Sequence, residues 1–165
     1  MDPNHPTATV YPVAVIMVCK ALAGNRWQTE QWEAAAVVDD TLPAAISERI
    51  PNCGGQLMRI KFGGHQIRLY RDEAEGYLLN ISSPHPKVFV LWRMQDELAQ
   101  PQRVTVSYYE GARWMDSDER VDGIPLPPEL LPWIHDFAIQ HYTPEAKKAK
   151  RYASNKDRGR MGRQE

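Results

Sequence analysis

Apolar and polar residues alternate through the middle of the chain in the pattern of β-strands. Residues 56–62 and 65–71 flank Gly63-Gly64, a pair that accepts the positive φ angles of a two-residue turn. We therefore predict a β-hairpin that turns at these glycines and pairs Ile60 with Ile67. Its apolar face, which we expect to pack on the core, carries Met58, Ile60, Ile67 and Leu69. Its opposite face carries Arg59, Lys61, Gln66 and Arg68.

Shorter apolar or alternating segments predict the remaining strands. These segments are residues 10–18, 34–38, 77–81, 88–93 and 104–108. Residues 95–102 are expected to connect the last two strands, and residues 44–50 to form a short helix that ends before Pro51. The sequence therefore predicts an α+β protein: a small antiparallel β-barrel or sandwich of about six strands with C-terminal helices.

The C-terminal third changes to a helical period. Its apolar positions follow helical spacing, and they are Leu130, Trp133, Ile134, Phe137 and His141. Thr143-Pro144-Glu145 has the residue types of a helix start, which predicts a second, basic helix running to about Tyr152. We expect a flexible N-terminus at 1–9, a single globular domain at 10–152 and a disordered basic tail at 153–165.

The net charge of −1 hides an uneven distribution of charge along the 165 residues. Residues 146–165 contain eight Lys and Arg against two acidic residues, whereas the rest of the chain has a net charge of −7. This division indicates partner contacts through the basic tail, although the tail could also fold back on the acidic body or stay solvated. The longest apolar run is too short to cross a membrane, and the N-terminus lacks the basic start of a signal peptide, so we expect a cytoplasmic protein.

Few residues have the grouping that catalysis or metal binding requires. Cys19 follows an apolar strand and is expected to be buried, and Cys53 has no basic neighbour to activate it. His135 and His141 lie six residues apart, which does not place them on one helical face. The acidic run at residues 116–122 has the density of a solvated loop. We expect no catalytic residue, no metal site and no cofactor.

Aromatic and basic residues are better candidates for binding. Trp92 and Trp133 are predicted to face the core, whereas three other tryptophans lie in polar surroundings and could form a partner surface or cover the ends of a barrel. These three are Trp27, Trp32 and Trp114. The hairpin face and the terminal helix supply one predicted basic surface, which consists of Arg59, Lys61, Arg68, Lys147, Lys148, Lys150 and Arg151.

Several segments together resemble a bacterial family of unknown function. They are Asn25-Arg26-Trp27 with Trp32-Glu33, Tyr77-Leu78-Leu79-Asn80-Ile81-Ser82, Val88-Phe89-Val90, and Val104-Thr105-Val106-Ser107-Tyr108-Tyr109-Glu110. The similarity extends over residues 12–155 and includes the segment 137–142 before the basic tail. Genes of this family tend to lie beside those of molybdenum- or tungsten-dependent formate dehydrogenases. The resemblance implies a role in the assembly, maturation or regulation of such an enzyme and transfers no catalytic residue.

Two functions follow from these observations. The first is a non-enzymatic accessory protein that contacts a formate dehydrogenase subunit or a maturation factor. The second is a nucleic-acid-binding module that uses the basic hairpin face and tail, because small β-barrels bind single strands with aromatic and basic side chains. The acidic body opposes the second function unless the basic residues are segregated from it.

Overall fold

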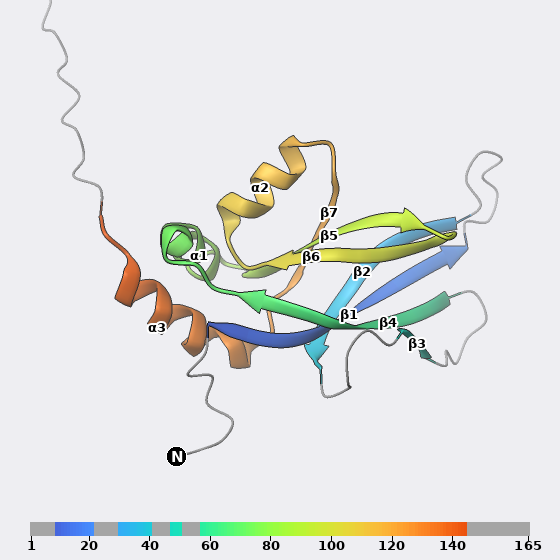
Figure 1. Ribbon diagram of the computed structural model, residues 1–165, viewed down its shortest axis with the longest axis horizontal. Coiled ribbons are helices and arrows are strands. Elements are labelled where there is room, and N and C mark those ends of the chain that lie inside the picture. Colours follow the sequence, from blue (N-terminus) through green and yellow to red (C-terminus); the bar gives the residue numbers. More distant parts are fainter. Residues whose placement is uncertain (1–8, 22–29, 41–46, 51–56, 145–165) are drawn as a thin grey trace, which may run out of the picture.

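The computed structural model describes residues 9–21, 30–40, 47–50 and 57–144, and within them seven strands form two antiparallel sheets (Figure 1). Sheet A has the order β2-β1-β4-β3, with β1 at Val10–Ala21, β2 at Glu30–Asp39, β3 at Ser47–Ile50 and β4 at Leu57–Arg68. Sheet B has the order β6-β5-β7, with β5 at Lys87–Gln95, β6 at Leu98–Thr105 and β7 at Arg120–Pro125. The α+β class and the antiparallel pairing are confirmed, but the described strands do not close into a barrel.

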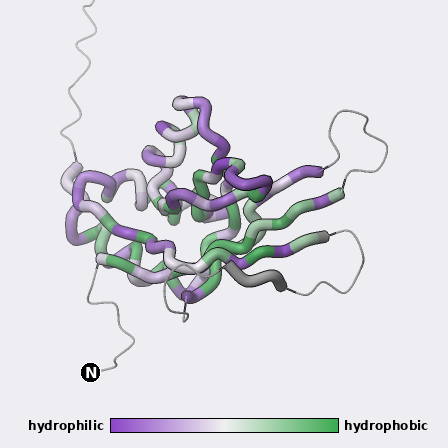
Figure 2. The backbone as a smooth tube through the Cα atoms, turned by 45° about the vertical axis from the view of Figure 1, so that its right-hand side comes forward, coloured by the Kyte–Doolittle hydropathy of each residue, from purple (hydrophilic) through white to green (hydrophobic). Residues whose placement is uncertain are grey.

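The two sheets and three helices enclose a main core and a smaller one. Sheet B lies over sheet A, and α2 (Tyr108–Asp116) covers the outer side of sheet B (Figure 1). The helices α1 (Ala74–Ile81) and α3 (Leu131–His141) lie together at one end. Hydrophobic stretches run through the middle of the molecule, where the strands pass (Figure 2). The smaller core joins Trp114 of α2 to Phe89 and Leu91 of β5. None of the described helices is long and apolar enough to cross a membrane.

The first strand is buried on both faces, as its apolar sequence predicts. Val15 and Met17 are fully buried in the main core, and Ala14 and Val18 are buried on the other face of β1. β1 lies in the centre of sheet A between β2 and β4, so each of its sides is also covered by a neighbouring strand. Burial of apolar surface is the main favourable contribution to folding. Because β1 is buried on both faces and paired on both sides, it is the centre of the fold.

The glycine pair interrupts one long strand instead of joining two. β4 runs along β1 without turning, and Phe62 and His65 pair with Val15 and Val13 of β1. The two glycines between them therefore stand opposite Ala14 alone, which makes a β-bulge. The predicted hairpin is wrong.

The bulge preserves the faces that the hairpin predicted. Gly64 has a φ of 81°, which a glycine adopts without steric cost, and its N–H donates to Oδ2 of Asp40 at 2.6 Å. One extra residue in a strand reverses the alternation of side chains, just as a two-residue turn does. Ile60 and Ile67 are accordingly both buried, while Arg59 and Arg68 are exposed.

The tight hairpin of this protein lies elsewhere, between β5 and β6. Gln95 pairs with Leu98, and the two turn residues Asp96 and Glu97 have φ angles of 52° and 63°. The predicted connection at 95–102 is thus mostly strand. The predicted strand at 104–108 is also wrong beyond Thr105, because the chain leaves β6 there and begins α2 at Tyr108.

Two further predictions fail on short segments, and the predicted solvated acidic loop holds only as far as the exposed turn at 117–118. Residues 77–81 belong to α1 instead of a strand. Five consecutive apolar or neutral residues show no period, so their pattern does not distinguish a helix from a strand. Ser47–Ile50 is β3 instead of a helix, and the rest of that segment lies outside the described residues. The acidic run at 116–122 enters β7, where Asp122 accepts hydrogen bonds from Trp92 Nε1 at 2.9 Å and from the Ala34 N–H at 2.8 Å.

The C-terminal helix confirms its periodicity. Ile134 and Ala138 of α3 are fully buried, and Trp133 and Phe137 pack partly buried against the main core. Pro132 occupies the first turn. The N–H groups of the first turn have no carbonyl partner within the helix, so a proline there costs no helical hydrogen bond. The predicted second helix, from residue 145 onward, and the tail lie outside the described residues.

The faces of β4 can be tested by two neighbouring substitutions. Ile60→Asp puts a charge at a position that is 2% exposed, so we expect it to lower the free energy of unfolding by more than about 4 kcal/mol. Arg59→Asp, on the opposite face, should change it by no more than about 0.5 kcal/mol. Urea denaturation measures both, and equal stabilities would contradict the assignment of faces.

Candidate functional site

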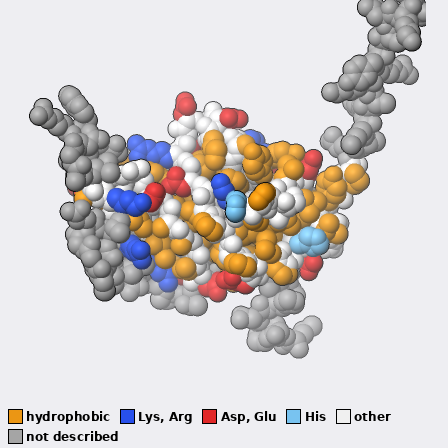
Figure 3. Space-filling model, turned by 180° about the vertical axis from the view of Figure 1, so that it is seen from behind, with side chains coloured by type: hydrophobic (Ala, Val, Ile, Leu, Met, Phe, Trp, Pro, Cys, Tyr) orange, Lys and Arg blue, Asp and Glu red, His pale blue; other side chains and the backbone are white. Residues whose placement is uncertain are grey.

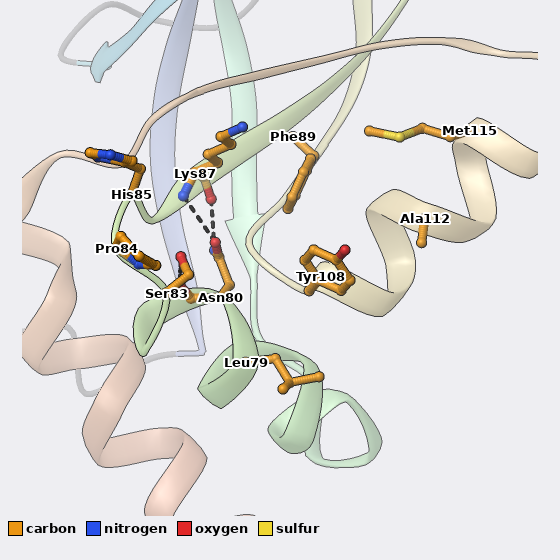
Figure 4. A pocket seen from close by; sticks show the side chains of 10 residues that line it. All are labelled: Leu79, Asn80, Ser83, Pro84, His85, Lys87, Phe89, Tyr108, Ala112 and Met115. Carbon is orange, nitrogen blue, oxygen red and sulfur yellow. Dashed lines mark hydrogen bonds between the residues drawn. The ribbon is translucent and has the colours of Figure 1, made fainter.

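A cavity of about 660 Å³ opens between α1, the loop that follows it, the start of β5, and α2 (Figure 4). Phe89 of β5, which is 6% exposed, forms part of its wall together with Ala112 of α2. Three large apolar side chains around it are exposed to solvent: Leu79 at 43%, Tyr108 at 54% and Met115 at 48%. Apolar pockets with a few polar groups are the usual form of a ligand or partner site.

One buried side chain holds the α1 side of this cavity in place. Asn80 is 2% exposed, and its Nδ2 donates to the carbonyl of Lys87 at 2.7 Å and to that of Val106 at 2.9 Å. Its Oδ1 accepts from the Lys87 N–H at 2.9 Å. The carboxamide therefore joins α1 to β5 and to the segment after β6. Figure 4 shows this side chain between the helix and the strand.

The loop after α1 is held by serine hydroxyls. Ser82 Oγ donates to the carbonyl of Leu78 at 2.5 Å, and Ser83 Oγ donates to that of Asn80 at 2.6 Å. Each carbonyl also accepts the backbone N–H of the same serine, at 3.0 Å and 3.1 Å, so the hydroxyls add a second hydrogen bond at the end of the helix. Pro84 and Pro86 then restrict the backbone on either side of His85. The loop thus places His85 at the rim of the cavity.

A second buried polar group holds the α2 side. Ser107 is fully buried, and its hydroxyl caps α2 by accepting from the Glu110 N–H at 3.2 Å. The same hydroxyl donates to the carboxylate of Glu73, which also pairs with the guanidinium of Arg113 on α2. The Glu73 side chain is mostly buried, so this pair is less screened than a surface ion pair. Hydrogen bonding to Glu73 raises the pKa of Arg113.

The contact between α2 and sheet B requires a glycine. A Cβ atom at Gly111 would lie 2.7 Å from Cγ of Phe89, closer than any side chain can approach. The ring of Tyr108 meets that of Phe89 edge-on, with centroids 6.3 Å apart. Tyr108, Ala112 and Met115 follow helical spacing and line the cavity from one side of α2.

Lys87 is the main charged group of the cavity. Its backbone N–H and carbonyl are bound by Asn80, while its ammonium group forms no ion pair within the described part of the chain. His85 also lines the cavity and is exposed. The site therefore combines an apolar wall with one free positive charge.

A second hollow of about 550 Å³ lies on the other side of α1, between that helix and α3. Leu78, Ile81 and Leu131 supply its apolar wall, and His135 and Asp136 lie at its edge. A broad area of apolar side chains, with histidines among them, covers the face seen in Figure 3. The exposed loop after α1 thus has an apolar hollow on each side, because residues of that loop line both.

Comparison with known families adds a classification to this geometry. A family model described as "Protein of unknown function (DUF3305)" matches residues 12–151. The chain belongs to this family. No curated protein and no solved structure matches the DUF3305 chain. The resemblance to an uncharacterised family is confirmed at this level.

Two of the tryptophans predicted to contact a partner are buried in this DUF3305 protein. Trp32 on β2 is 9% exposed and belongs to the main core, and Trp114 on α2 is 8% exposed and belongs to the smaller core. Because both side chains are buried, neither offers a surface to a partner. Their polar neighbours in sequence, Gln31 and Arg113, are exposed. Trp27 lies outside the described residues.

The predicted basic residues are not brought into one cluster by the described structure. Arg59, Lys61 and Arg68 all lie on β4. The two arginines pair with Val18 and Val10 of β1, which places them about 26 Å apart along the strand. Lys61 is half-buried. The cations of the terminal helix lie outside the described residues, and they are Lys147, Lys148, Lys150 and Arg151.

The residues that form the cavity were missed by sequence reasoning. Leu79 and Asn80 were assigned to a strand, and Tyr108 was placed at the end of another, so no spacing linked them. The i, i+4, i+7 spacing of Tyr108, Ala112 and Met115 was the available signal. Within the described residues, no group of His, Cys, Asp and Glu is arranged to hold a metal ion, and Cys19 is buried with a pKa raised by burial.

Removal of the Asn80 carboxamide tests its role in the site. Asn80→Ala removes one buried and two partly buried hydrogen bonds to backbone groups, so we expect the free energy of unfolding to fall by about 3 kcal/mol. Leu79→Ala, on the exposed side of the same helix, should cost less than about 1 kcal/mol. Chemical denaturation of the two variants makes the comparison, and a similar loss in both would show that the carboxamide is not the main support.

Proposed function

We propose that this DUF3305 protein is a non-enzymatic accessory protein that binds a protein partner through the cavity between α1, α2 and β5. Its partner, in the context that the family resemblance implies, is a molybdopterin-dependent formate dehydrogenase or a factor that matures it. The contact takes place in the cytoplasm. The proposal concerns assembly, maturation or regulation of the enzyme instead of its chemistry.

The observation that carries the proposal is the grouping of exposed apolar side chains around one cavity. Leu79, Tyr108 and Met115 come from two helices, and each exposes more than two fifths of its surface. Isolated exposed apolar residues are ordinary on a protein surface, but a group around a hollow is typical of an interaction site. Burial of these side chains by a partner would supply the apolar centre that stable interfaces have.

The polar groups of the cavity favour binding over catalysis. The Asn80 carboxamide and the Ser83 hydroxyl are used to hold backbone groups of the protein itself. The remaining charge is the Lys87 ammonium group, which lies beside an apolar wall. The complementary surface is a protein segment that presents a large apolar side chain next to a carboxylate, because the carboxylate would neutralise Lys87.

The alternative of nucleic-acid binding has weaker support from the structure. The described cations that it would use are spread along β4. In the same sheet, β2 carries Asp39 and Glu33, and Glu33 pairs with Lys20 of β1. A polyanion would meet these carboxylates as well as the arginines. Retention on single-stranded DNA that weakens as salt increases remains the result expected from this alternative.

Paired substitutions at the cavity test the proposal. A tagged chain carrying Leu79→Ser and Met115→Ser should capture at least about tenfold less formate dehydrogenase than the unmodified chain, from cells that make the molybdenum enzyme. Quantitative mass spectrometry of the enzyme subunits measures the capture. Lys87→Glu should also reduce it by reversing the charge at the rim.

Ile139→Ser is the matched control, since Ile139 is 56% exposed on α3 and lines neither hollow. It should capture as much enzyme as the unmodified chain, and thermal denaturation should show that all the variants fold. Equal capture by the double variant would reject the cavity as the contact. No capture by the unmodified chain would reject formate dehydrogenase as the partner.

A further inference from the structure

A polar hollow of about 240 Å³ lies at the opposite flank of α2, between the edges of the two sheets. β3 pairs with β4 only from Arg59 to Phe62, so the edge of β4 beyond the bulge has no neighbouring strand among the described residues on that side. This open edge faces β6, which is an edge strand of sheet B. Glu110 of α2 also lines the hollow. It follows Tyr108 by two residues, which turns its side chain by about 200° around the helix axis.

Two arginines from different sheets line this hollow. Arg68 comes from the end of β4, and Arg103 comes from β6. Neither forms an ion pair with a carboxylate in the described part of the chain. The Arg103 guanidinium lies over the ring of Trp114 at 5.0 Å from its centroid, which fixes its position without neutralising its charge. Two like charges that share a small hollow repel each other until an anion lies between them.

Among the described residues that line the hollow, the two guanidinium groups face one carboxylate, so they remain in excess. Burial lowers the pKa of His65, so its ring is uncharged at neutral pH and provides one hydrogen-bond donor. The Tyr70 side chain is 46% exposed and adds a hydroxyl donor. Gln66 accepts from Arg68 Nη2 at 3.4 Å. Glu110 is the carboxylate of the hollow, and it lies 3.9 Å from Arg113, which pairs more closely with Glu73.

We propose that this hollow binds the phosphate group of a small phosphorylated molecule. A phosphate monoester carries nearly two negative charges at neutral pH, which matches two guanidinium groups. Planar guanidinium groups donate paired hydrogen bonds to phosphate oxygens. The hydroxyl of Tyr70 and the ring N–H of His65 are two further hydrogen-bond donors of the hollow. The hollow has more volume than one phosphate requires, so part of the esterified molecule can enter as well. The proposal does not depend on the partner proposed above.

Titration of the labelled full chain with inorganic phosphate tests the site. Under constant ionic strength, backbone amide signals of Gln66, Arg68 and Arg103 should shift along one saturable curve. Arg68→Gln and Arg103→Gln should each weaken binding roughly fivefold, as expected for partly exposed charge-assisted contacts. Arg59→Gln is the control, because Arg59 is an exposed arginine on the same strand outside the hollow. Unsaturable shifts, or equal weakening by Arg59→Gln, would overturn the proposal.

Two further ligands identify the source of the phosphate. Adenosine 5′-monophosphate should bind at least as tightly as inorganic phosphate and shift the same amides, because the hollow has room beyond the phosphate. A single-stranded DNA oligonucleotide should bind with no higher affinity per phosphate group than the monophosphate does. Binding of the oligonucleotide alone, with no saturable response to either small ligand, would contradict the small-molecule site and support a nucleic-acid surface instead.

Discussion

The three hydrogen bonds of the Asn80 carboxamide determine how the helical end of the molecule meets the sheets. One side chain binds both backbone groups of Lys87 and the carbonyl of Val106, and it is almost wholly buried. The start of β5, the segment after β6 and helix α1 therefore keep a fixed relation to one another. A buried polar group in this position is costly without its partners and strongly directional with them. The orientation of α1, and with it the position of Leu79, follows from this contact.

Ser107 has the corresponding role for α2. It caps the helix, contacts the carboxylate of Glu73 and is fully buried, while Arg113 completes the link from the other end of the helix. These polar contacts hold the two helices together with Tyr77 of α1 in the main core and Trp114 of α2 in the smaller core. Apolar residues on the other sides of both helices stay uncovered. The exposure of Leu79, Tyr108 and Met115 is a consequence of this arrangement, and it is the feature on which the proposed protein contact depends.

The sequence predicted the faces of the strands better than their connections. A two-residue turn and a β-bulge reverse the alternation equally, so the pattern around Gly63-Gly64 identified Ile60 and Ile67 as core residues without revealing that β4 is continuous. The α+β class was predicted. β1 was predicted from its continuous apolar run, and β5 and α3 were predicted from their clear periods. Helix α1 was missed because its run is short and nearly uniformly apolar. The cavity could not be predicted, since its two helices are held by Asn80 and Ser107 through contacts with residues distant in sequence. Asn80 binds the carbonyl of Val106, and Ser107 binds the carboxylate of Glu73.

Amide hydrogen exchange of the complex with formate dehydrogenase tests the central claim, that the cavity between the two helices is the contact surface. Compared with the free chain, the complex should exchange more slowly at residues 79–87 and 108–115, because a bound partner covers these segments and suppresses their local opening. Residues 59–68 should be unchanged. Protection confined to residues 59–68, with the cavity segments exchanging as in the free chain, would contradict the account and assign the contact to the basic face of β4.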